Sequence, residues 1–203
     1  MGPSFDLLET LRWTPEEAFF LLERHLDRLQ ASARYFGYTC STDDVRKALA
    51  DAVASADGPL RIRLLVGRDG AIRVEQTPLQ PSAGPVRVGL AASPIDPADP
   101  FLFHKTTNRV AQERARSPIY DEMVLWNPDR EITEAINANI VVDLEGHRVT
   151  PPVACGLLGG TMRAELLATG EIHEARVTIA RLRAAPRFWL INSVRGWRPA
   201  LLA

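Results

Sequence analysis

The stretch LRIRLLVGRDGAIRVEQ, residues 60–76, contains the clearest secondary-structure signal in the chain. Apolar and polar residues alternate on both sides of Asp69-Gly70, and such a pair favours the tight turn of a β-hairpin. Directly upstream, TDDVRKALADAVASADG at 42–58 has the spacing of apolar residues that is typical of a helix. A helix that leads into a hairpin indicates a fold in which both kinds of element mix.

Further upstream the sequence predicts one more strand and one more helix. FDLLETLRW at 5–13 is a plausible strand. TPEE at 14–17 has the pattern of a helix start, with Thr14 as the cap and Pro15 in the first turn. Gly37 stands where the helix would end. The residues that keep helical spacing between these points are Leu22, Leu26, Leu29, Ala33 and Phe36.

Two proline-rich segments divide the rest of the chain. TPLQPSAGP at 77–85 is interpreted as a domain boundary, with a small N-terminal domain at 1–80 and a C-terminal domain at 81–203. SPIDPADP at 93–100 is interpreted as a loop that enters the site. The expected later elements are the strands VRVGLAA, MVLWN, ANIVVDL, HRVTP and RFWLINSV, the last of these being the final strand, and the helical stretches NRVAQERARS and GTMRAELLATG. Strands and helices do not alternate regularly, so we predict the α+β class rather than a doubly wound sheet.

Composition excludes several classes of protein. The 203 residues are 46% hydrophobic and 24% charged, with a net charge of −1, which gives no reason to expect binding to nucleic acid or to an anionic membrane. No apolar run approaches the roughly 20 residues of a membrane helix, and MGPSFDLLET lacks the pattern of a secretion signal. Cys40 and Cys155 are expected to be free thiols in a reducing cytoplasm. Four scattered histidines argue against a metal centre.

Two stretches contain basic residues in unusual surroundings. In ERHLDRL, His25 and Arg28 are three residues apart and therefore neighbours on a helix, where Arg28 could bind a phosphate. In FLFHKTTNR, residues 101–109, Lys105 follows two aromatic residues and a histidine. A lysine in an apolar pocket loses solvation of its ammonium, and its amine becomes nucleophilic. The alternatives are a solvated helix flank for Arg28 and a surface position for Lys105.

Two other stretches suggest the recognition of charge. In EITEAINANIVV, Glu134 comes just before an expected strand and could pair with a cationic ring nitrogen, while Asn139 could tie down the turn. Gly159-Gly160-Thr161 stands at the entrance to a helix, where backbone N–H groups and the helix dipole favour an anion. A solvated strand-edge glutamate and a flexible loop capped by threonine are the alternatives. The nucleotide-binding patterns GxxxxGK[ST] and GxGxxG are absent.

In their order and rough spacing, these stretches resemble the fold-type IV pyridoxal-phosphate enzymes. This family contains branched-chain aminotransferases, D-amino-acid aminotransferases and 4-amino-4-deoxychorismate lyases. The stretches that carry the resemblance are HLDRL, HKTTNR, TEAINANI, LLGGTMR and NSVRGW. FDLLETLRW, LLERHLDRL, FHKTTNR and LINSVRGW resemble in particular the lyase-like domain that is fused to aminodeoxychorismate synthase component I.

The resemblance implies a fold and a set of roles. It implies a small N-terminal α/β domain and a larger mixed-sheet domain, and it places AFFLL in a strand, the helix start near Glu23, and TPEE in a hairpin turn. Lys105 matches the Schiff-base lysine and acid/base, and Glu134 matches the glutamate facing the pyridine nitrogen. The other implied cofactor contacts are Arg28, Asn139, Gly160, Thr161, Met162 and Ser193, while Thr10 would lie beside the substrate. Arg109 and Arg195 are candidates for binding substrate carboxylates.

The implied activity is that of a cytoplasmic, homodimeric lyase that forms 4-aminobenzoate and pyruvate from 4-amino-4-deoxychorismate in folate biosynthesis, with aminodeoxychorismate synthase as a candidate partner. A class IV aminotransferase of the branched-chain or D-amino-acid type is one alternative, and a non-catalytic relative is another. Three departures from the family pattern keep the non-catalytic reading open. The chain begins at the family's second or third strand, Gln112 stands where a tyrosine is frequent, and LLGG replaces LLPG at Gly159.

Overall fold

The computed structural model describes residues 4–81 and 84–203, which form two compact units. The first unit contains the chain up to Pro81 together with His104–Asn108, and the second contains the remaining chain to Phe103 and Arg109–Ala203. Part of the proline-rich segment 77–85, residues 82–83, lies outside the described residues. The segment with Lys105 therefore belongs by its contacts to the first unit, although the sequence-based boundary at residue 80 assigns it to the C-terminal domain.

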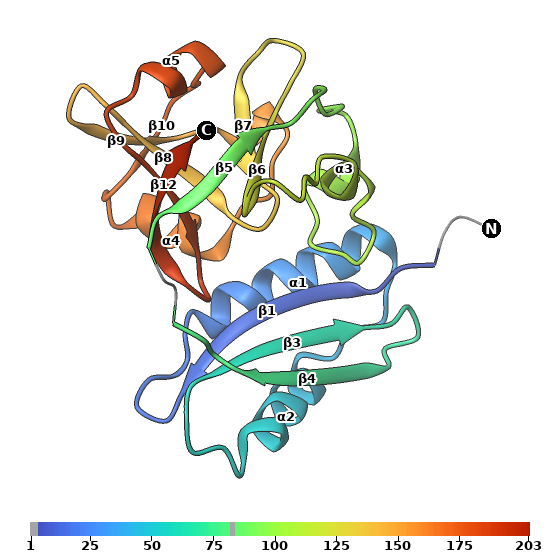
Figure 1. The fold of residues 1–203 in the computed structure, drawn as a ribbon. Helices are drawn as coiled ribbons and strands as arrows, with labels where there is room; N and C mark the ends of the chain where they lie inside the picture. Colours follow the sequence, from blue (N-terminus) through green and yellow to red (C-terminus); the bar gives the residue numbers. More distant parts are fainter. Residues whose placement is uncertain (1–3, 82–83) are drawn as a thin grey trace. The chain divides into compact units, whose positions relative to one another are not determined.

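The first unit is built on a four-stranded antiparallel sheet with the order β2-β1-β3-β4 (Figure 1). Its strands are β1 (Leu7–Thr14), β2 (Ala18–Phe19), β3 (Leu60–Val66) and β4 (Ile72–Pro78). The predicted hairpin is confirmed as β3–β4, and Gly70 adopts the positive φ of 89° that its turn requires. β4 extends through Pro78, two residues into the stretch that the sequence suggested was a connection.

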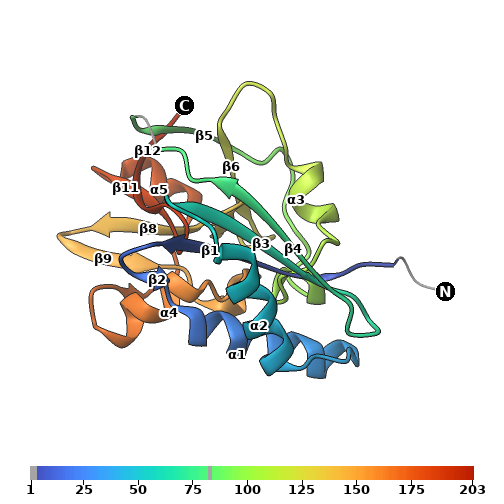
Figure 2. The ribbon, with the colours of Figure 1, turned by 90° about the horizontal axis from the view of Figure 1, so that it is seen from below.

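Helices α1 (Leu22–Phe36) and α2 (Thr42–Val53) cover one face of this sheet (Figures 1 and 2). The helix start predicted at TPEE is wrong, and the hairpin turn implied by the resemblance is confirmed. Thr14 Oγ1 accepts a hydrogen bond from Glu17 N at 3.1 Å and closes a turn between β1 and β2. A threonine hydroxyl caps a turn as readily as a helix, so the local pattern was ambiguous. α1 ends at Gly37, as predicted, with φ at 67°.

The segment with Lys105 pairs with an edge of β1. Thr106 forms an antiparallel bridge with Leu7, and Leu8 N donates to Lys105 O at 2.9 Å. β3 occupies the other edge of β1 from Leu7 to Trp13, and β2 pairs only with Trp13 and Thr14. Residues 105–107 therefore extend the β2 side of the sheet, and main-chain hydrogen bonds fix the lysine in the first unit.

The second unit contains an eight-stranded mixed sheet with the order β10-β9-β8-β11-β12-β5-β6-β7. β5 is parallel to β6 and β12, and in Figure 1 the red β12 lies beside the green β5. Ala135, the last residue of β7, forms a bridge with Ala138, which directly precedes β8, so the chain turns sharply from the edge strand β7 into β8 and the sheet curls. Its strands are β5 (Val86–Leu90), β6 (Glu122–Trp126), β7 (Ile132–Ala135), β8 (Asn139–Leu144), β9 (His147–Thr150), β10 (His173–Glu174), β11 (Phe188–Asn192) and β12 (Gly196–Leu202).

Helices lie between these strands and confirm the α+β class. They are η1 (Pro100–Leu102), α3 (Val110–Arg114), η2 (Val153–Cys155), α4 (Thr161–Ala168) and α5 (Ile179–Ala184). The core of this unit is formed by aliphatic residues of the sheet such as Val88, Val124, Ile140 and Leu190.

Two sequence-based expectations for the second unit are wrong. Glu134 was expected just before a strand but lies within β7, whose short sequence ITEA includes polar residues that are buried. RFWLINSV was expected to contain the last strand, but β12 follows it. β12 contains Pro199, which normally argues against an inner strand, so periodicity could not identify it.

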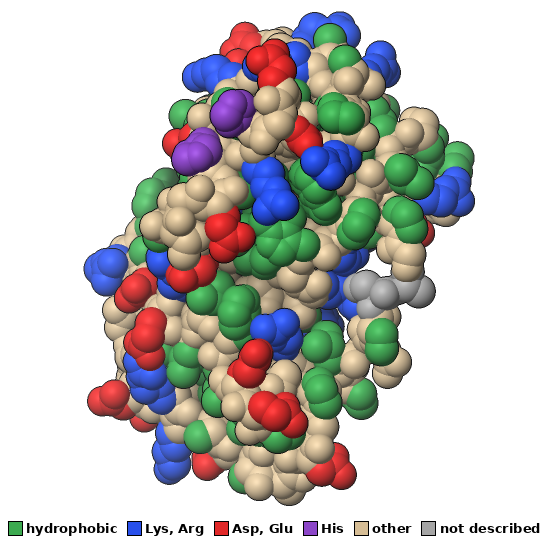
Figure 3. Space-filling view, turned by 90° about the vertical axis from the view of Figure 1, so that its left-hand side faces the viewer, with side chains coloured by type: hydrophobic (Ala, Val, Ile, Leu, Met, Phe, Trp, Pro, Cys, Tyr) green, Lys and Arg blue, Asp and Glu red, His purple; other side chains and the backbone are tan. Residues whose placement is uncertain are grey.

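The described residues also show the following features of the surface and of the thiols. No helix among residues 4–81 and 84–203 is long and apolar enough to cross a membrane. In the same ranges no group of three or more His, Cys, Asp or Glu side chains could hold a metal ion. Cys40 and Cys155 are unpaired thiols. Acidic and basic side chains are mixed on the face drawn in Figure 3, as the net charge of −1 suggests.

Candidate active site

A buried carboxylate organises the polar cluster of the first unit. Glu9 lies on β1 and is only 1% exposed. It points to the same side as Leu7 and Leu11, which pack in the core with α1, because alternate residues of a strand share a face. Its Oε1 accepts a hydrogen bond from Arg28 Nε at 2.8 Å, and its Oε2 accepts one from Arg28 Nη2 at 2.6 Å. The same Oε2 lies 2.7 Å from His25 Nδ1. His25 and Arg28 therefore share a helical face, as their spacing predicted.

The cluster has a marked electrostatic character. Burial raises the pKa of Glu9, but the charges and hydrogen bonds of Arg28 and His25 outweigh it and bring this pKa to about 2. Burial lowers the pKa of His25 despite its contact with Glu9, and the positive charges of Arg28 and Lys105 lower it further. His25 is therefore a neutral donor to Glu9 at neutral pH. The effect of Lys105 on His25 places the lysine ammonium near this cluster.

The residue before Lys105 is also anchored in the first unit. The ring of His104 stacks on Tyr35 with centroids 4.3 Å apart, and its Nδ1 lies 3.0 Å from Ser32 Oγ. Both partners come from α1. Lys105 itself is half-buried. The lysine is thus held through the main chain on β1 and through its neighbour on α1. Thr10, also on β1, is half-buried and lies opposite Arg63 of β3, on the face away from Glu9.

In the second unit, two predicted cofactor residues hold one peptide segment. Glu134, on β7 and 5% exposed, accepts Leu158 N on its Oε2 at 3.2 Å. Asn139, the first residue of β8, donates from its Nδ2 to Leu158 O at 2.8 Å. Asn139 therefore ties down the loop before α4 instead of its own turn. Two strands that are consecutive in the sequence, β7 and β8, together fix the segment before the helix.

The loop that Glu134 and Asn139 hold leads into the N-terminus of α4. Gly160 is the N-cap residue, and the buried Thr161 and Met162 form the first turn. The first four backbone N–H groups of a helix have no partner within the helix, and with the dipole they favour an anion. The helix entrance predicted at Gly159-Gly160-Thr161 is confirmed.

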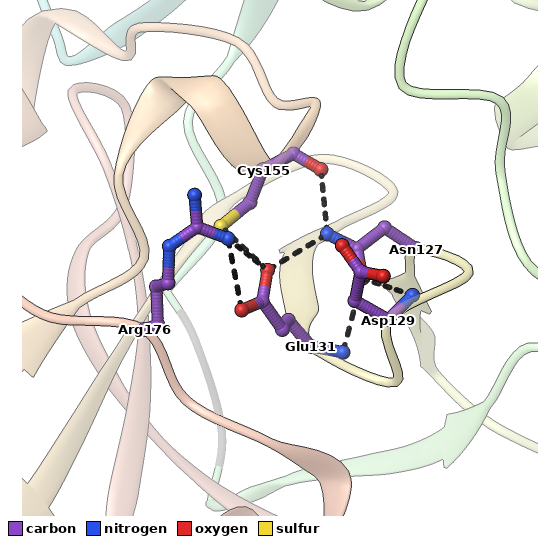
Figure 4. A network of polar contacts seen from close by, with 5 residues as sticks. All are labelled: Asn127, Asp129, Glu131, Cys155 and Arg176. Atoms are coloured by element: carbon purple, nitrogen blue, oxygen red, sulfur yellow. Dashed lines mark hydrogen bonds and ion pairs between the residues drawn. The ribbon is translucent and has the colours of Figure 1, made fainter.

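A second network fixes the start of the same loop (Figure 4). Arg176 Nη1 donates to both carboxylate oxygens of Glu131, at 2.9 and 2.7 Å. Asn127 Nδ2 donates to Glu131 Oε2 at 3.0 Å and to Cys155 O at 3.3 Å, and the Cys155 thiol donates to Glu131 Oε2 at 3.3 Å. Glu131 stands immediately before β7, so the start of β7 holds Cys155 while Glu134 holds Leu158.

Three further predicted residues also lie in this unit. Ser193 is 6% exposed in the turn between β11 and β12. In that turn Arg195 is exposed, and its backbone N donates to Asn192 Oδ1 at 2.8 Å. Arg109 donates from Nη2 to Ile136 O at 2.6 Å and to Asn137 Oδ1 at 3.1 Å.

The electrostatic surroundings of Arg109 connect it with Glu134. Burial lowers the pKa of the Arg109 guanidinium, and the negative charge of Glu134 opposes this effect. Arg109 therefore lies close to Glu134, the carboxylate that is predicted to face the pyridine nitrogen of the cofactor.

The structure divides the predicted residues between the two units. Lys105, Arg28 and Thr10 belong to the first, and the others belong to the second. Sequence reasoning missed Glu9, Asn127 and Glu131. For Glu9 a signal existed, because an acidic residue stands between Leu7 and Leu11 at the period of a buried strand face. No local pattern identified the other two, whose partners are distant in the sequence.

Comparisons with known proteins identify relatives of the whole chain. The family model described as amino-transferase class IV matches residues 6–202. A Schizosaccharomyces pombe protein provisionally named an aminodeoxychorismate lyase is 32% identical over 178 residues, which cover 83% of this chain and 76% of that protein.

The chain is also similar to solved structures of proteins named as aminotransferases and as lyases. That of a provisionally named amino-acid aminotransferase from Mesorhizobium loti has 35% identity and a TM-score of 0.93, with 98% of this chain and 100% of that chain covered. That of 4-amino-4-deoxychorismate lyase from Pseudomonas aeruginosa has 25% identity and a TM-score of 0.80, with 97% and 82% covered.

Proposed function

The chain belongs to the class IV aminotransferase family, a family of pyridoxal-phosphate-dependent enzymes. From this premise we propose that it is a lyase that converts 4-amino-4-deoxychorismate into 4-aminobenzoate and pyruvate. The Schizosaccharomyces pombe and Pseudomonas aeruginosa relatives, both named as lyases of this kind, support the proposal. Because aromatisation of the ring drives this reaction, the protein mainly has to position groups and transfer protons.

The residues present fit pyridoxal phosphate chemically. The Arg28 guanidinium and the amides at the start of α4 are donors suited to a phosphate. The buried Glu134 carboxylate suits a protonated ring nitrogen, since a nearby negative charge favours the cationic form. The absence of a side chain at Gly160 lets Asn139 lie close to the start of α4, because a Cβ there would collide with Asn139 Oδ1. The bound cofactor would supply an electron sink for the carbon that loses its proton.

The observation that carries the proposal is the position of the lysine. The chain contains two lysines, Lys47 and Lys105. Lys47 is exposed on α2, whereas Lys105 is half-buried, held on β1, and close enough to His25 to influence its pKa. A lysine that binds the cofactor covalently must be held beside the group that binds the phosphate. Lys105 shares its unit with Arg28, and its main chain is bonded to Leu8, the neighbour of Glu9 in β1.

Each residue is proposed to have a separate task. Arg28, together with the amides of Gly160, Thr161 and Met162, would bind the phosphate. Glu134 would keep the ring nitrogen protonated. The amine of Lys105 would remove the proton from the ring carbon that bears the amino group, because a positioned amine beside that carbon is a suitable acid/base. The bond from the neighbouring ring carbon to the enolpyruvyl oxygen would break, and the protonated amine would give the proton to the departing enolpyruvyl group, which leaves as pyruvate.

The remaining candidates would complete the cofactor and substrate contacts. Ser193 would add a second phosphate contact, and Asn139 would act through the backbone of Leu158. Thr10 would contact the substrate. Arg109 and Arg195 would bind its two carboxylates, since guanidinium groups bind carboxylates with paired hydrogen bonds.

The experiment that tests the proposal compares Lys105→Ala with Lys47→Ala. Wild type and Lys47→Ala should form 4-aminobenzoate from enzymatically generated 4-amino-4-deoxychorismate, and borohydride should attach the cofactor to the peptide that contains Lys105. Lys105→Ala should lose both product formation and trapping. Attachment at Lys47 would contradict the assignment of the lysine. A wild type that gains no absorbance near the visible edge on mixing with pyridoxal phosphate would instead indicate a non-catalytic relative.

A class IV aminotransferase is the second candidate, favoured by the 35% identity to the Mesorhizobium loti protein. The two activities would use the same cofactor residues and differ at the substrate. Incubation with D-alanine or a branched-chain amino acid plus a keto acid distinguishes them. Full conversion of the cofactor spectrum to the pyridoxamine form, with turnover and without 4-aminobenzoate formation, would replace the lyase by the aminotransferase.

A further inference from the structure

Glu9 binds Arg28 in a way that determines where the guanidinium points. The carboxylate takes both Nε and Nη2, at 2.8 and 2.6 Å, so the contact involves one whole edge of the planar group. Two parallel hydrogen bonds fix the plane of a guanidinium as well as its position. Nη1 and the second hydrogen of Nη2 take no part in this contact with Glu9.

The carboxylate itself is rigidly held. Glu9 is 1% exposed, and its Oε2 also contacts His25 Nδ1 at 2.7 Å. Three hydrogen bonds from two residues of α1 therefore converge on one side chain of β1. A buried acceptor with this many charge-assisted partners cannot turn without leaving a donor unsatisfied.

The same strand holds the lysine segment at the adjacent residue. Leu8 N donates to Lys105 O at 2.9 Å, and Leu7 is bridged to Thr106. Consecutive residues of β1 thus fix the main chain of Lys105 and the side chain of Arg28. The positions of Lys105 and of the Arg28 guanidinium are therefore both fixed relative to β1.

We propose that Glu9 is a positioning residue for the cofactor phosphate: it aims the outer edge of Arg28 at the phosphate in fixed register with Lys105. This inference rests on the function proposed above and goes beyond it, because it assigns phosphate recognition to a residue that would not touch the cofactor. It also gives a reason for burying a carboxylate between β1 and α1, where an apolar residue would be easier to accommodate.

A competing account makes Glu9 only a counter-charge for Arg28. The two accounts predict opposite changes in phosphate affinity when Glu9 is replaced. A counter-charge weakens the attraction of Arg28 for a phosphate, so its removal should tighten phosphate binding. A positioning residue should, when removed, weaken phosphate binding, because the flexible arginine must then be ordered by the phosphate alone. Glu9→Asp separates the two, since it keeps the charge but is one methylene too short for the same contact.

The test measures binding of pyridoxal phosphate and of pyridoxal, which lacks the phosphate, by the absorbance that each gains near the visible edge when attached to the lysine. The variants are Glu9→Gln and Glu9→Asp. The matched control is Glu75→Gln, which removes an exposed ion pair with Arg63, 2.9 Å long, from the same sheet. Both Glu9 variants should bind pyridoxal phosphate at least tenfold more weakly, pyridoxal should bind within about twofold of wild type, and the control should match wild type for both.

Each other outcome has a defined meaning. If pyridoxal phosphate binds Glu9→Gln as tightly as wild type or tighter, or if Glu9→Asp behaves as wild type, the inference is wrong. An equal loss for both ligands would mean that Glu9 merely supports the fold, which also overturns the inference. In addition, Arg28→Gln should cost little further affinity in the Glu9→Gln background, and full additivity of the two changes would contradict the coupling. Failure of wild type to bind either ligand would overturn the proposed function itself.

Discussion

Asn139 Oδ1 occupies the space that a side chain on Gly160 would need. The same amide donates from Nδ2 to Leu158 O at 2.8 Å, so it is already fixed on the segment that leads to Gly160. Asn139 can therefore take this position, at the start of β8, only because residue 160 has no Cβ. This arrangement brings the start of α4 against the sheet.

Gly160→Ala should displace Asn139 and with it the loop. We expect a loss of about 1–3 kcal/mol in the free energy of unfolding, as for other overpacked sites, together with weaker binding of pyridoxal phosphate. Gly159→Ala is the control, since a Cβ there would meet only Val153 Cγ2, at the ordinary distance of 3.9 Å. Urea unfolding and cofactor titration would measure both. Equal effects of the two substitutions would show that Asn139 does not restrict residue 160.

Glu134→Gln should affect activity far more than stability. The glutamine oxygen can still accept Leu158 N, so the free energy of unfolding should change by about 1 kcal/mol or less. Loss of the negative charge should lower kcat on the order of a hundredfold. Glu122→Gln is the control, because burial already raises the pKa of Glu122 toward its neutral form. Comparable activity of the two variants would remove Glu134 from its proposed role.

Acid should destabilise the first unit through Glu9. Its pKa is lowered from 4.5 to about 2 in the folded chain, so the unfolded chain binds the proton first as the pH falls. The stabilisation, on the order of 3 kcal/mol, is fully present above about pH 5 and is lost as the pH falls toward 2. His25, whose pKa is also lowered, acts in the same direction below its ordinary value of 6.5.

Urea unfolding of wild type and Glu9→Gln between pH 7 and 3 would check this pH dependence. The stability difference between the two proteins should shrink as the pH falls. A difference that stays constant over this range would mean that Glu9 has an ordinary pKa in the folded protein.

Asn127 should contribute more to stability than Arg176, although both contact Glu131. Asn127 is 3% exposed, and its amide makes four hydrogen bonds, with Glu131 Oε2, Cys155 O and the backbone N–H groups of Asp129 and Glu131. Asn127→Ala should cost about 2–3 kcal/mol. The Arg176 side chain is 57% exposed, and Arg176→Ala should cost at most about 1 kcal/mol. Chemical denaturation measures both, and the reverse order would contradict the network.

Cys155 should resist alkylation in the folded protein. Burial, the hydrogen bond to Glu131 and the charge of Glu131 raise the pKa of its thiol to about 11, and the residue is 0% exposed. Only the thiolate reacts with iodoacetamide. The half-buried Cys40 should therefore be modified first at pH 8, and both thiols should react in denaturant. Peptide mass spectrometry identifies the site, and early modification of Cys155 would mean that η2 opens readily.

Much of the local structure could be predicted from the residues alone. The β3–β4 hairpin, the end of α1 at Gly37 and the α4 entrance at Gly160 depend on turn and cap residues close in the sequence, and such signals are local. Lys105, Arg28 and Glu134 are proposed as site residues because five motifs occur in the order of one family. No single one of them was distinctive, since each also suits an ordinary surface position.

The long-range contacts were not predictable in this way. The segment of Lys105 lies on β1 through backbone hydrogen bonds to Asp6 and Leu8, about a hundred residues earlier, and backbone bonds leave no mark on side-chain identity. The residue type alone does not distinguish the buried Glu9 from a glutamate that is exposed to solvent. Its burial follows from two partners that α1 brings to it, because a carboxylate can leave water only where donors are already arranged to receive it.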